Sequence, residues 1–239
     1  MNSEQLSSRL QSVSDFIIQY GPNPIRLADI GTDHAYLPSF LVQQDKIEFA
    51  IAGDVVKGPY ESAVKEVQSQ GLSKQISVRL GDGLEVIHSE DNINTISICG
   101  MGGTLIRNII ESGSAHLPKE HLLVLQPNIG EAGLREWLSE NQYEIIDETV
   151  IIDGRHDYDV MVVEKGTTNI PLSYEEKLFG PANLAKQTDE FYLKWERDLA
   201  HRERIYEQIK QADQPNHEKL TELEQAITAI KEVLNRDAN

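Results

Sequence analysis

Short apolar runs and amphipathic helical stretches alternate along the first 165 residues, and most of the apolar runs end in an acidic residue or a glycine. The predicted strands are the apolar runs at residues 25–31, 48–55, 76–83, 95–103 and 122–128. The predicted helices, with apolar residues three or four positions apart, are 6–17, 37–44, 62–70, 105–111 and 133–140. Strands that alternate with helices form βαβ units, so the pattern predicts an α/β fold with a parallel sheet and right-handed crossovers.

Two further β-rich runs close this part of the chain. They cover residues 143–154 and 158–166 and are separated only by about a turn. No helix lies between them, although a parallel crossover would need one. We therefore expect these two strands to form an antiparallel pair at one edge of the sheet.

The chain beyond residue 165 has a different character. Only two of the 16 glycines lie there, and two long stretches carry apolar residues at spacings of three and four. These stripes cover residues 192–209 and 220–234, with the helix breaker Pro215 between them. The pattern predicts two helices in an antiparallel hairpin of the coiled-coil type, with the stripes as packing seams. We expect one domain over residues 1–165 and a helical domain over residues 166–239.

The charge of the chain is strongly acidic. It carries 22 Lys and Arg against 39 Asp and Glu, a formal net charge of -17. Such an excess argues against binding to nucleic acid or anionic membranes by bulk electrostatics. The excess is uneven, because residues 1–164 hold 11 basic and 25 acidic residues, whereas residues 165–239 hold 11 and 14. A local basic face in the helical part is therefore compatible with the composition.

Several classes of protein are disfavoured by what the sequence lacks. No apolar run reaches the roughly 18 residues of a membrane span, and the polar start lacks the apolar core of a signal peptide. The single cysteine, Cys99, forms no intrachain disulfide, and one Cys with seven scattered His gives no zinc-ligand spacing. We expect a cytoplasmic protein with no membrane partner and no metal.

Parallel sheets of this kind bind ligands at the carboxyl ends of their strands, so the residues after each apolar run are the informative ones. The chain has no phosphate-binding P-loop pattern. The dinucleotide pattern G-x-G-x-x-G keeps only Gly31, because Asp33 and Tyr36 occupy the next two glycine positions. An aspartate would repel a pyrophosphate, which disfavours NAD as the ligand.

A cationic cofactor without phosphate fits these strand ends better. Carboxylates satisfy the sulfonium and α-ammonium groups of S-adenosylmethionine, and Asp54, 23 residues after Gly31, suits its ribose diol. Asp82 follows the third apolar run and suits the adenine amino group. Any one of these acids could equally be a solvated loop residue or a helix N-cap. Their occurrence at successive strand ends, with glycines beside them, favours a binding site.

The chemistry of the sequence alone does not assign a role to three other residues. Cys99 fits a small buried residue better than a nucleophile. His34 is either a residue supporting the site or plain surface, and His156 lies in the loop GRHDYD.

Six segments together resemble the TrmK family of bacterial tRNA adenine N1-methyltransferases, which modify adenine-22 of tRNA. They are RLADIGTDHAYLP, AIAGDVVKGPYESA, VRLGDGLEVI, ISICGMGGTLIRNII, LVLQPNIGEAGLREWL and GRHDYDVMVVEKG. The resemblance covers residues 1–165 and extends, by architecture, to the helical hairpin. It implies a Rossmann-like class I methyltransferase fold, with seven strands of which one is antiparallel, and S-adenosyl-L-methionine as the cofactor. Asp33 and Ala35 stand where class I enzymes usually have glycines, which looks like the TrmK pattern.

The resemblance also implies a set of cofactor-binding residues. The loop after the first strand would hold the methionine end, the second strand end the ribose, and the third strand end the adenine. The fourth strand end would line the cofactor. The implied residues are Asp29, Gly31, Thr32, Asp33, His34, Asp54, Val55, Asp82, Gly83, Gly100, Met101, Gly102 and Gly103.

The target atom suggests a mechanism. N1 of neutral adenine has a free lone pair, so no base has to remove a proton first, and catalysis can come mostly from positioning. We expect Asp33 to stabilise the charge that develops on the base, with Gln126 and Asn128 orienting the base edge. Asp33 could instead only bind the α-ammonium group of the cofactor.

For a tRNA partner, we expect Arg155, His156 and Tyr158 to hold the target adenine, Tyr158 by stacking. The residues expected to grip the tRNA backbone lie on the first hairpin helix and include Lys194, Arg197 and Arg202. The alternative for these bases is a solvated helix face with ion pairs four residues apart.

Two other functions compete with tRNA methylation. A class I methyltransferase could act on a small molecule or a protein, with the helical hairpin as a dimerisation element. A non-catalytic module that kept the cofactor pocket is disfavoured, because the strand-end acids and GMGG are intact. We expect a monomer or a weak homodimer.

Overall fold

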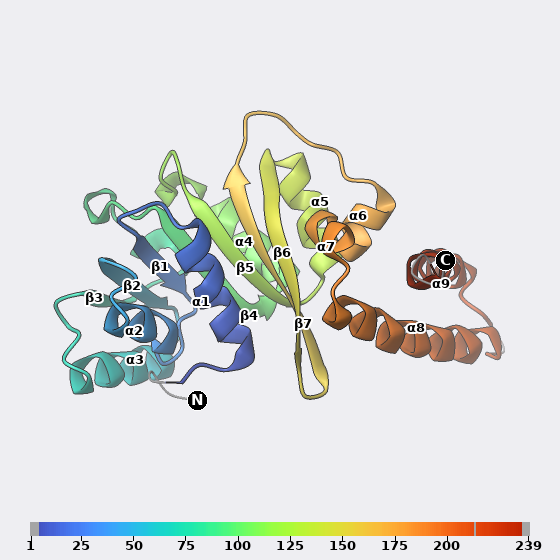
Figure 1. Ribbon diagram of the computed structural model, residues 1–239, viewed down its shortest axis with the longest axis horizontal. Coiled ribbons are helices and arrows are strands. Elements are labelled where there is room, and N and C mark those ends of the chain that lie inside the picture. Colours follow the sequence, from blue (N-terminus) through green and yellow to red (C-terminus); the bar gives the residue numbers. More distant parts are fainter. Residues whose placement is uncertain (1–4, 213, 236–239) are drawn as a thin grey trace. The chain divides into compact units, whose positions relative to one another are not determined.

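The computed structural model describes residues 5–212 and 214–235. It separates into two compact units, Met1–Leu184 and Ala185–Asn239. The first unit contains a seven-stranded sheet in the order β3-β2-β1-β4-β5-β7-β6 (Figure 1). The strands are β1 Arg26–Ile30, β2 Phe49–Asp54, β3 Ile76–Leu80, β4 Thr95–Gly102, β5 Leu122–Ile129, β6 Tyr143–Asp153 and β7 His156–Lys165.

The sheet has the predicted mixture of directions. Strands β1 to β5 pair in parallel, whereas β7 is antiparallel to both of its neighbours, β5 and β6. The expected antiparallel pair at one edge is therefore confirmed, with β6 outermost. Since β7 runs against both β5 and β6, the carboxyl end of β6 lies at the same edge of the sheet as the carboxyl ends of β1 to β5.

Helices cover both faces of this sheet. The five helices predicted in the α/β part are present as α1 Ser8–Tyr20, α2 Tyr36–Gln43, α3 Lys57–Ser69, α4 Gly103–Ser112 and α5 Glu131–Glu140. Short 3-10 helices occupy the connections at η1 Gly83–Val86, η2 Ser89–Asp91 and η3 Ser114–His116.

Two hydrophobic clusters lie on the opposite faces of the sheet. Leu122 and Val124 of β5 belong to the cluster under α1, α2 and α3, whereas Leu123 and Leu125 belong to the cluster under α4 and α5. Alternate side chains of a strand point to opposite faces, so a strand that is apolar throughout is buried on both. Burial of each such Leu side chain stabilises the folded state by about 1.5–3 kcal/mol relative to leaving it exposed. The uninterrupted apolar runs of the sequence follow directly from this two-sided burial.

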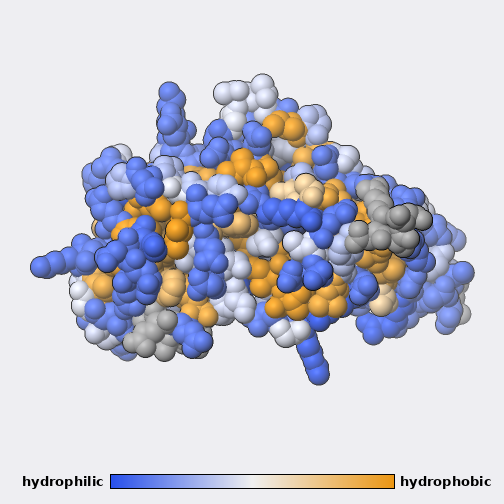
Figure 2. All heavy atoms as spheres, viewed as in Figure 1, coloured by the Kyte–Doolittle hydropathy of each residue, from blue (hydrophilic) through white to orange (hydrophobic). Residues whose placement is uncertain are grey.

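The surface of the molecule is largely polar. On the face shown in Figure 2, hydrophilic residues cover most of the surface and apolar residues form separate patches. No helix among the described residues is long and apolar enough to cross a membrane.

The boundary between the two units lies later than the sequence predicts. The expected boundary was residue 165, but the first unit continues to Leu184. The added segment contains α6 Tyr174–Phe179 and the start of α7 Pro181–Lys186, two short helices that the sequence did not indicate.

A buried ionic cluster explains why this segment belongs to the first unit. Arg135 of α5 is fully buried; its Nε lies 2.7 Å from Glu148 Oε1, and its Nη2 lies 3.5 Å from Asp159 Oδ1. The added segment bonds to the same groups, because Ala182 N donates to Glu148 Oε2 at 3.1 Å and Asn183 Nδ2 to Asp159 Oδ1 at 3.2 Å. Buried charges need such partners, so the cluster anchors the segment.

The second unit is a helical hairpin formed by α8 Asp189–Lys210 and α9 His217–Asn235. Tyr206 donates to the carboxylate of Glu224, and Lys231 Nζ lies 2.7 Å from Glu203 Oε1. The two predicted helices and the break between them are confirmed. Figure 1 shows α8 lengthwise and α9 close to end-on, and the coiled-coil packing of the hairpin stays a prediction. The stripe on α8 is only half-buried over much of its length.

We predict that replacing Arg135 by Met lowers the free energy of unfolding by about 3–5 kcal/mol, because Glu148 and Asp159 then stay buried without their cation. Urea denaturation measures the change. The matched control is Arg107→Met on α4, whose partner Glu111 is exposed, and a surface pair of this kind contributes about 0–1 kcal/mol. Equal, small losses in both variants would show that the Arg135 cluster does not anchor the fold.

Candidate active site

A cavity of about 340 Å³ lies where the carboxyl ends of β1, β2, β3 and β4 meet. Cavities of this size are typical of small-molecule sites. Eight of the predicted cofactor residues line it: Gly31, Asp33, Asp54, Val55, Asp82, Gly83, Gly100 and Met101. The other five predicted residues, Asp29, Thr32, His34, Gly102 and Gly103, do not line this cavity.

Asp29 holds the floor of the site from within the protein. Its Oδ1 accepts the hydroxyl of Ser97 at 2.7 Å, and its Oδ2 accepts the hydroxyl of Thr32 at 2.6 Å. Burial raises the pKa of Asp29, and the two hydroxyl hydrogen bonds oppose that rise. Asp29 and Thr32 therefore tie β1, β4 and the first loop together beneath the cavity.

The loop after β1 turns sharply because three of its residues have a left-handed backbone. The φ angles are +72° at Gly31, +55° at Asp33 and +56° at Ala35. Gly31 is also required by space, since a Cβ there would lie 2.1 Å from Cε of Met101. Left-handed residues other than glycine cost roughly 1–2 kcal/mol each. The loop is thus held in a costly conformation that brings Asp33 to the rim of the cavity.

Asp54 connects this loop to the next one. Its Oδ2 accepts the backbone N–H of Asp33 at 3.3 Å, and its Oδ1 accepts that of Val56 at 2.8 Å. Val56 is the residue that precedes α3. The carboxylate that the sequence analysis assigned to a ribose therefore also sets the spacing of two loops around the cavity.

The QPN segment near the end of β5 holds the irregular carboxyl end of β4. Gly100 has φ +76°, and its N–H donates to Gln126 Oε1 at 2.9 Å. Its carbonyl accepts from Asn128 Nδ2 at 2.7 Å. Both backbone groups of a cavity-lining glycine are thereby held by side chains of a neighbouring strand.

Gln126 does not reach the cavity in the way the sequence analysis expected. Its side chain is fully buried, and its Nε2 donates to Pro127 O at 2.8 Å and to Asn128 Oδ1 at 3.1 Å. With its oxygen also occupied, Gln126 has no group left to orient a base edge. The geometry makes it a residue that positions Gly100, whereas Asn128 is exposed at the strand end.

Arg9 was missed by the sequence analysis. It projects from α1, and its Nη1 donates to the same Gln126 oxygen. Its guanidinium carbon also lies 5.5 Å from the centre of the Tyr158 ring. No local pattern could have singled it out, since Arg9 and Gln126 are 117 positions apart in the sequence.

Gly103 supports the site through backbone packing. A Cβ at Gly103 would lie 2.5 Å from the carbonyl oxygen of Gly130. The turn after β4 and the turn after β5 therefore approach closely there, and no side chain fits between them. Two apolar side chains stand exposed beside these turns, Leu105 at 50% and Ile129 at 71% exposure.

The tip of the β6–β7 hairpin lies at the same edge of the sheet as the cavity. The β5–β7 pairing stops at Leu125 and Met161, but β6 and β7 continue to pair as far as Asp153 and His156. The hairpin therefore extends past the last β5–β7 pair. The three predicted substrate residues Arg155, His156 and Tyr158 all belong to this extension, with Tyr158 half-buried beside Arg9 and the other two exposed.

The structure places His34 beside the first loop and Cys99 in the wall of the cavity. His34 stacks on Tyr36, with ring centres 5.1 Å apart, and its Nε2 lies 3.6 Å from Asp33 Oδ1. It therefore supports the first loop from outside the cavity. Burial raises the pKa of the Cys99 thiol far above its ordinary value, so Cys99 lines the cavity as a neutral group.

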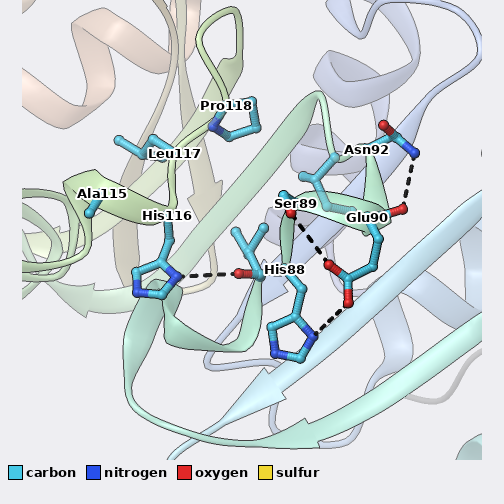
Figure 3. A pocket seen from close by; sticks show the side chains of 10 residues that line it. His88, Ser89, Glu90, Asn92, Ala115, His116, Leu117 and Pro118 are labelled. Atoms are coloured by element: carbon cyan, nitrogen blue, oxygen red, sulfur yellow. Dashed lines mark hydrogen bonds and ion pairs between the residues drawn. The ribbon is translucent and has the colours of Figure 1, made fainter.

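A larger cavity of about 900 Å³ lies elsewhere (Figure 3). Its walls are the segments that lead into β4 and β5, so it sits at the amino edge of the sheet. His88 and His116 belong to it, and Figure 3 shows His116 directed at the backbone of Ile87 and His88 at Glu90. None of the strand-end acids lies there, and the described residues contain no group of three or more metal-ligating side chains.

The basic residues predicted to grip RNA lie on α8, within the second unit. Lys194 Nζ lies 5.2 Å from the centre of the Trp195 ring, and Arg197 is exposed. Arg202 donates to Asp198, one turn earlier on the same helix. That pairing fits the alternative of a solvated charged helix for Arg202.

The sheet order, the single antiparallel strand and the acid-lined cavity at the carboxyl edge define a class I methyltransferase. Residues 27–232 match the family model described as TrmK, tRNA (adenine(22)-N(1))-methyltransferase. The chain belongs to this family. A Bacillus subtilis (strain 168) tRNA (adenine(22)-N(1))-methyltransferase is 43% identical over 98% of this chain and 99% of its own length.

Solved structures agree in fold over nearly the whole chain. A Streptococcus pneumoniae protein in complex with S-adenosyl-L-methionine is 38% identical, with a TM-score of 0.85 over 96% of this chain and 100% of its own. TrmK of M. capricolum, in complex with S-adenosyl-homocysteine, is 30% identical, with a TM-score of 0.80 over 96% of this chain and 98% of its own.

We predict that Gly103→Ala destabilises the protein by about 1–3 kcal/mol, since the added carbon forces the two turns apart. Urea denaturation provides the measurement. Gly133→Ala on α5 is the matched control, because a Cβ there meets nothing within 4 Å, and alanine in a helix is favoured over glycine by about 0.5–1 kcal/mol. Unchanged stability in Gly103→Ala would mean that the turns can separate freely.

Proposed function

We propose that the protein transfers the methyl group of S-adenosyl-L-methionine to N1 of adenine-22 in tRNA. The observation that supports this most strongly is family membership over residues 27–232 combined with an acid-lined cavity at the carboxyl edge. The alternative, a small-molecule or protein substrate, has no comparable support among the relatives. We further propose that the protein works in the cytoplasm as a monomer or weak homodimer.

The cavity suits this cofactor by charge. Three carboxylates line it, from Asp33, Asp54 and Asp82, and no phosphate-binding pattern accompanies them. We assign Asp54 to the ribose hydroxyls and Asp82 to the adenine amino group. Gly31 and Gly100 leave room for the cofactor because their backbones, with left-handed φ, lie directly at the cavity wall.

The bound cofactor supplies an electrophilic methyl group. The lone pair of adenine N1 forms the new N–C bond while the C–S bond breaks, and the released electron pair stays on sulfur. The products are N1-methyladenine, which carries the positive charge, and neutral S-adenosylhomocysteine. No proton has to leave N1 before attack, so the protein mainly positions the base in line with the methyl group.

Asp33 is the carboxylate best placed to act on the base. It stands at the rim of the cavity, its side chain is 65% exposed, and the left-handed loop fixes its direction. A negative charge beside the adenine ring stabilises the positive charge that develops there. We propose that Asp33 has this catalytic role and that Asn128 contributes to orienting the base edge from the end of β5.

The β6–β7 hairpin is proposed to receive the nucleotide. N1 lies on the Watson–Crick edge, so a paired or stacked adenine must be extruded, at a cost of a few kcal/mol. Tyr158 can offset part of that cost by stacking, and Arg155 and His156 at the exposed tip can contact the neighbouring backbone. Their position at the same edge as the cavity supports this assignment.

The direct test of the function is incubation with cofactor and an unmodified tRNA transcript, followed by nuclease digestion and nucleoside mass spectrometry. N1-methyladenine at position 22 is the expected product. Methylation of a protein or metabolite panel with none on tRNA would favour the alternative substrate class.

We predict that Asp33→Asn lowers kcat at least about tenfold, equivalent to about 1.4 kcal/mol, while the cofactor Kd stays within about threefold. Asparagine tolerates the left-handed backbone, so the substitution removes charge without refolding the loop. Asp45→Asn is the matched control, since Asp45 is also exposed with φ +53° but does not line the cavity. Loss of cofactor affinity with normal turnover would assign Asp33 to the α-ammonium group instead.

We predict that the double replacement of Lys194 and Arg197 by Gln reduces the salt dependence of tRNA binding. The slope of log K against log salt concentration should fall by about 0.7–0.9 for each lost phosphate contact. Fluorescence anisotropy at several salt concentrations gives the slope. Lys219→Gln is the control, because Lys219 lies on the other helix of the hairpin, α9. An unchanged slope in the double variant contradicts a phosphate-binding role for α8.

A further inference from the structure

Arg9 stands at a junction of three elements that are far apart in the sequence. It projects from α1, donates to Gln126 of β5 and lies over the ring of Tyr158 of β7. The guanidinium is half-buried. Among the described residues it has no carboxylate within ion-pair distance, so its fixed partners are an amide oxygen and an aromatic ring.

One partner of Arg9 contacts the cofactor cavity, and the other belongs to the hairpin proposed to receive the nucleotide. Gln126 holds the N–H of Gly100, which lines the cofactor cavity. Tyr158 belongs to the hairpin assigned to the nucleotide. A continuous chain of contacts therefore runs from the Tyr158 ring through Arg9 and Gln126 to Gly100.

The chemistry of the reaction argues against direct action of Arg9 on the base. Positive charge develops on the adenine as the methyl group arrives, and a guanidinium beside N1 would oppose it. Behind Gln126 and Tyr158, the same cation can orient both groups. Arginine suits this task because its planar head stacks on an aromatic face while its N–H groups bond in a fixed plane.

We propose that Arg9 is a positioning residue that holds the carboxyl end of β4 and the β6–β7 hairpin in one arrangement, so that cofactor and nucleotide meet in line. The inference rests on the proposed function, because it takes Tyr158 as part of the nucleotide side. It also adds the N-terminal helix to the working parts of the enzyme, although Arg9 precedes the family-matched residues 27–232.

The test compares three full-length variants. Arg9→Met should lower kcat on the tRNA transcript at least about tenfold, while the cofactor Kd by calorimetry changes less than about threefold, since Gln126 can still bond Gly100. Arg9→Lys keeps the charge without the planar head and should restore only part of the loss.

Arg26→Met is the matched control for losing a half-buried arginine. Arg26 also lies over an aromatic ring, 4.7 Å from that of Phe49, and its Nη1 lies 2.8 Å from Glu48 Oε1. It sits at the start of β1, at the amino edge of the sheet. Its replacement should leave kcat within about twofold of the wild type, even where stability falls, because it touches no part of the site.

A double-mutant cycle tests the link itself. Arg9→Met and Tyr158→Leu should together lower kcat by clearly less than the product of their separate effects, since both break the same connection. Multiplicative effects would overturn the coupling, and an Arg9→Met turnover no lower than that of Arg26→Met would overturn the positioning role alone. A wild-type protein that leaves tRNA unmethylated would instead overturn the proposed function, and this inference with it.

Discussion

The architecture of the site depends on one buried carboxylate. Asp29, the penultimate residue of β1, has both oxygens bonded, one to Ser97 of β4 and one to Thr32 of the first loop. A buried carboxylate without such partners would be costly, so the bonds fix the two central strands and the loop in one position. The left-handed turn at Gly31 and Asp33 starts from this point, and Asp54 then joins that turn to the start of α3. The cavity is the space that these connections leave open.

Much of this arrangement could be predicted from sequence, because strand and helix periodicity place the ends of the apolar runs at one edge. The parallel strands with an antiparallel pair at one edge and the gathering of Asp33, Asp54 and Asp82 around a cavity follow from that pattern. The closed hydrogen bonding of Gln126 could not be predicted, since it depends on a helix 117 residues away. The helices α6 and α7 could not be predicted, because six residues are too few to show a helical period.

Several of the carboxylates that make the chain acidic have structural partners inside the protein. Asp29 and Asp54 work as structural hydrogen-bond acceptors before any ligand arrives, and the buried Arg135 offsets one of the two negative charges of Glu148 and Asp159. Part of the negative charge is therefore internal, and a formal charge of -17 overstates what a polyanion meets at the surface. The bases of α8 lie in the second unit, where acidic and basic residues are nearly balanced.

The anchoring of residues 166–184 has a consequence for how family members can exchange parts. The Arg135 cluster makes this segment a portion of the sheet-bearing unit, although it lies beyond the last strand of the sheet. A chimaera joined at residue 165 would separate Glu148 and Asp159 from the Ala182 and Asn183 groups that bond to them here. Junctions after Leu184 keep those partners together.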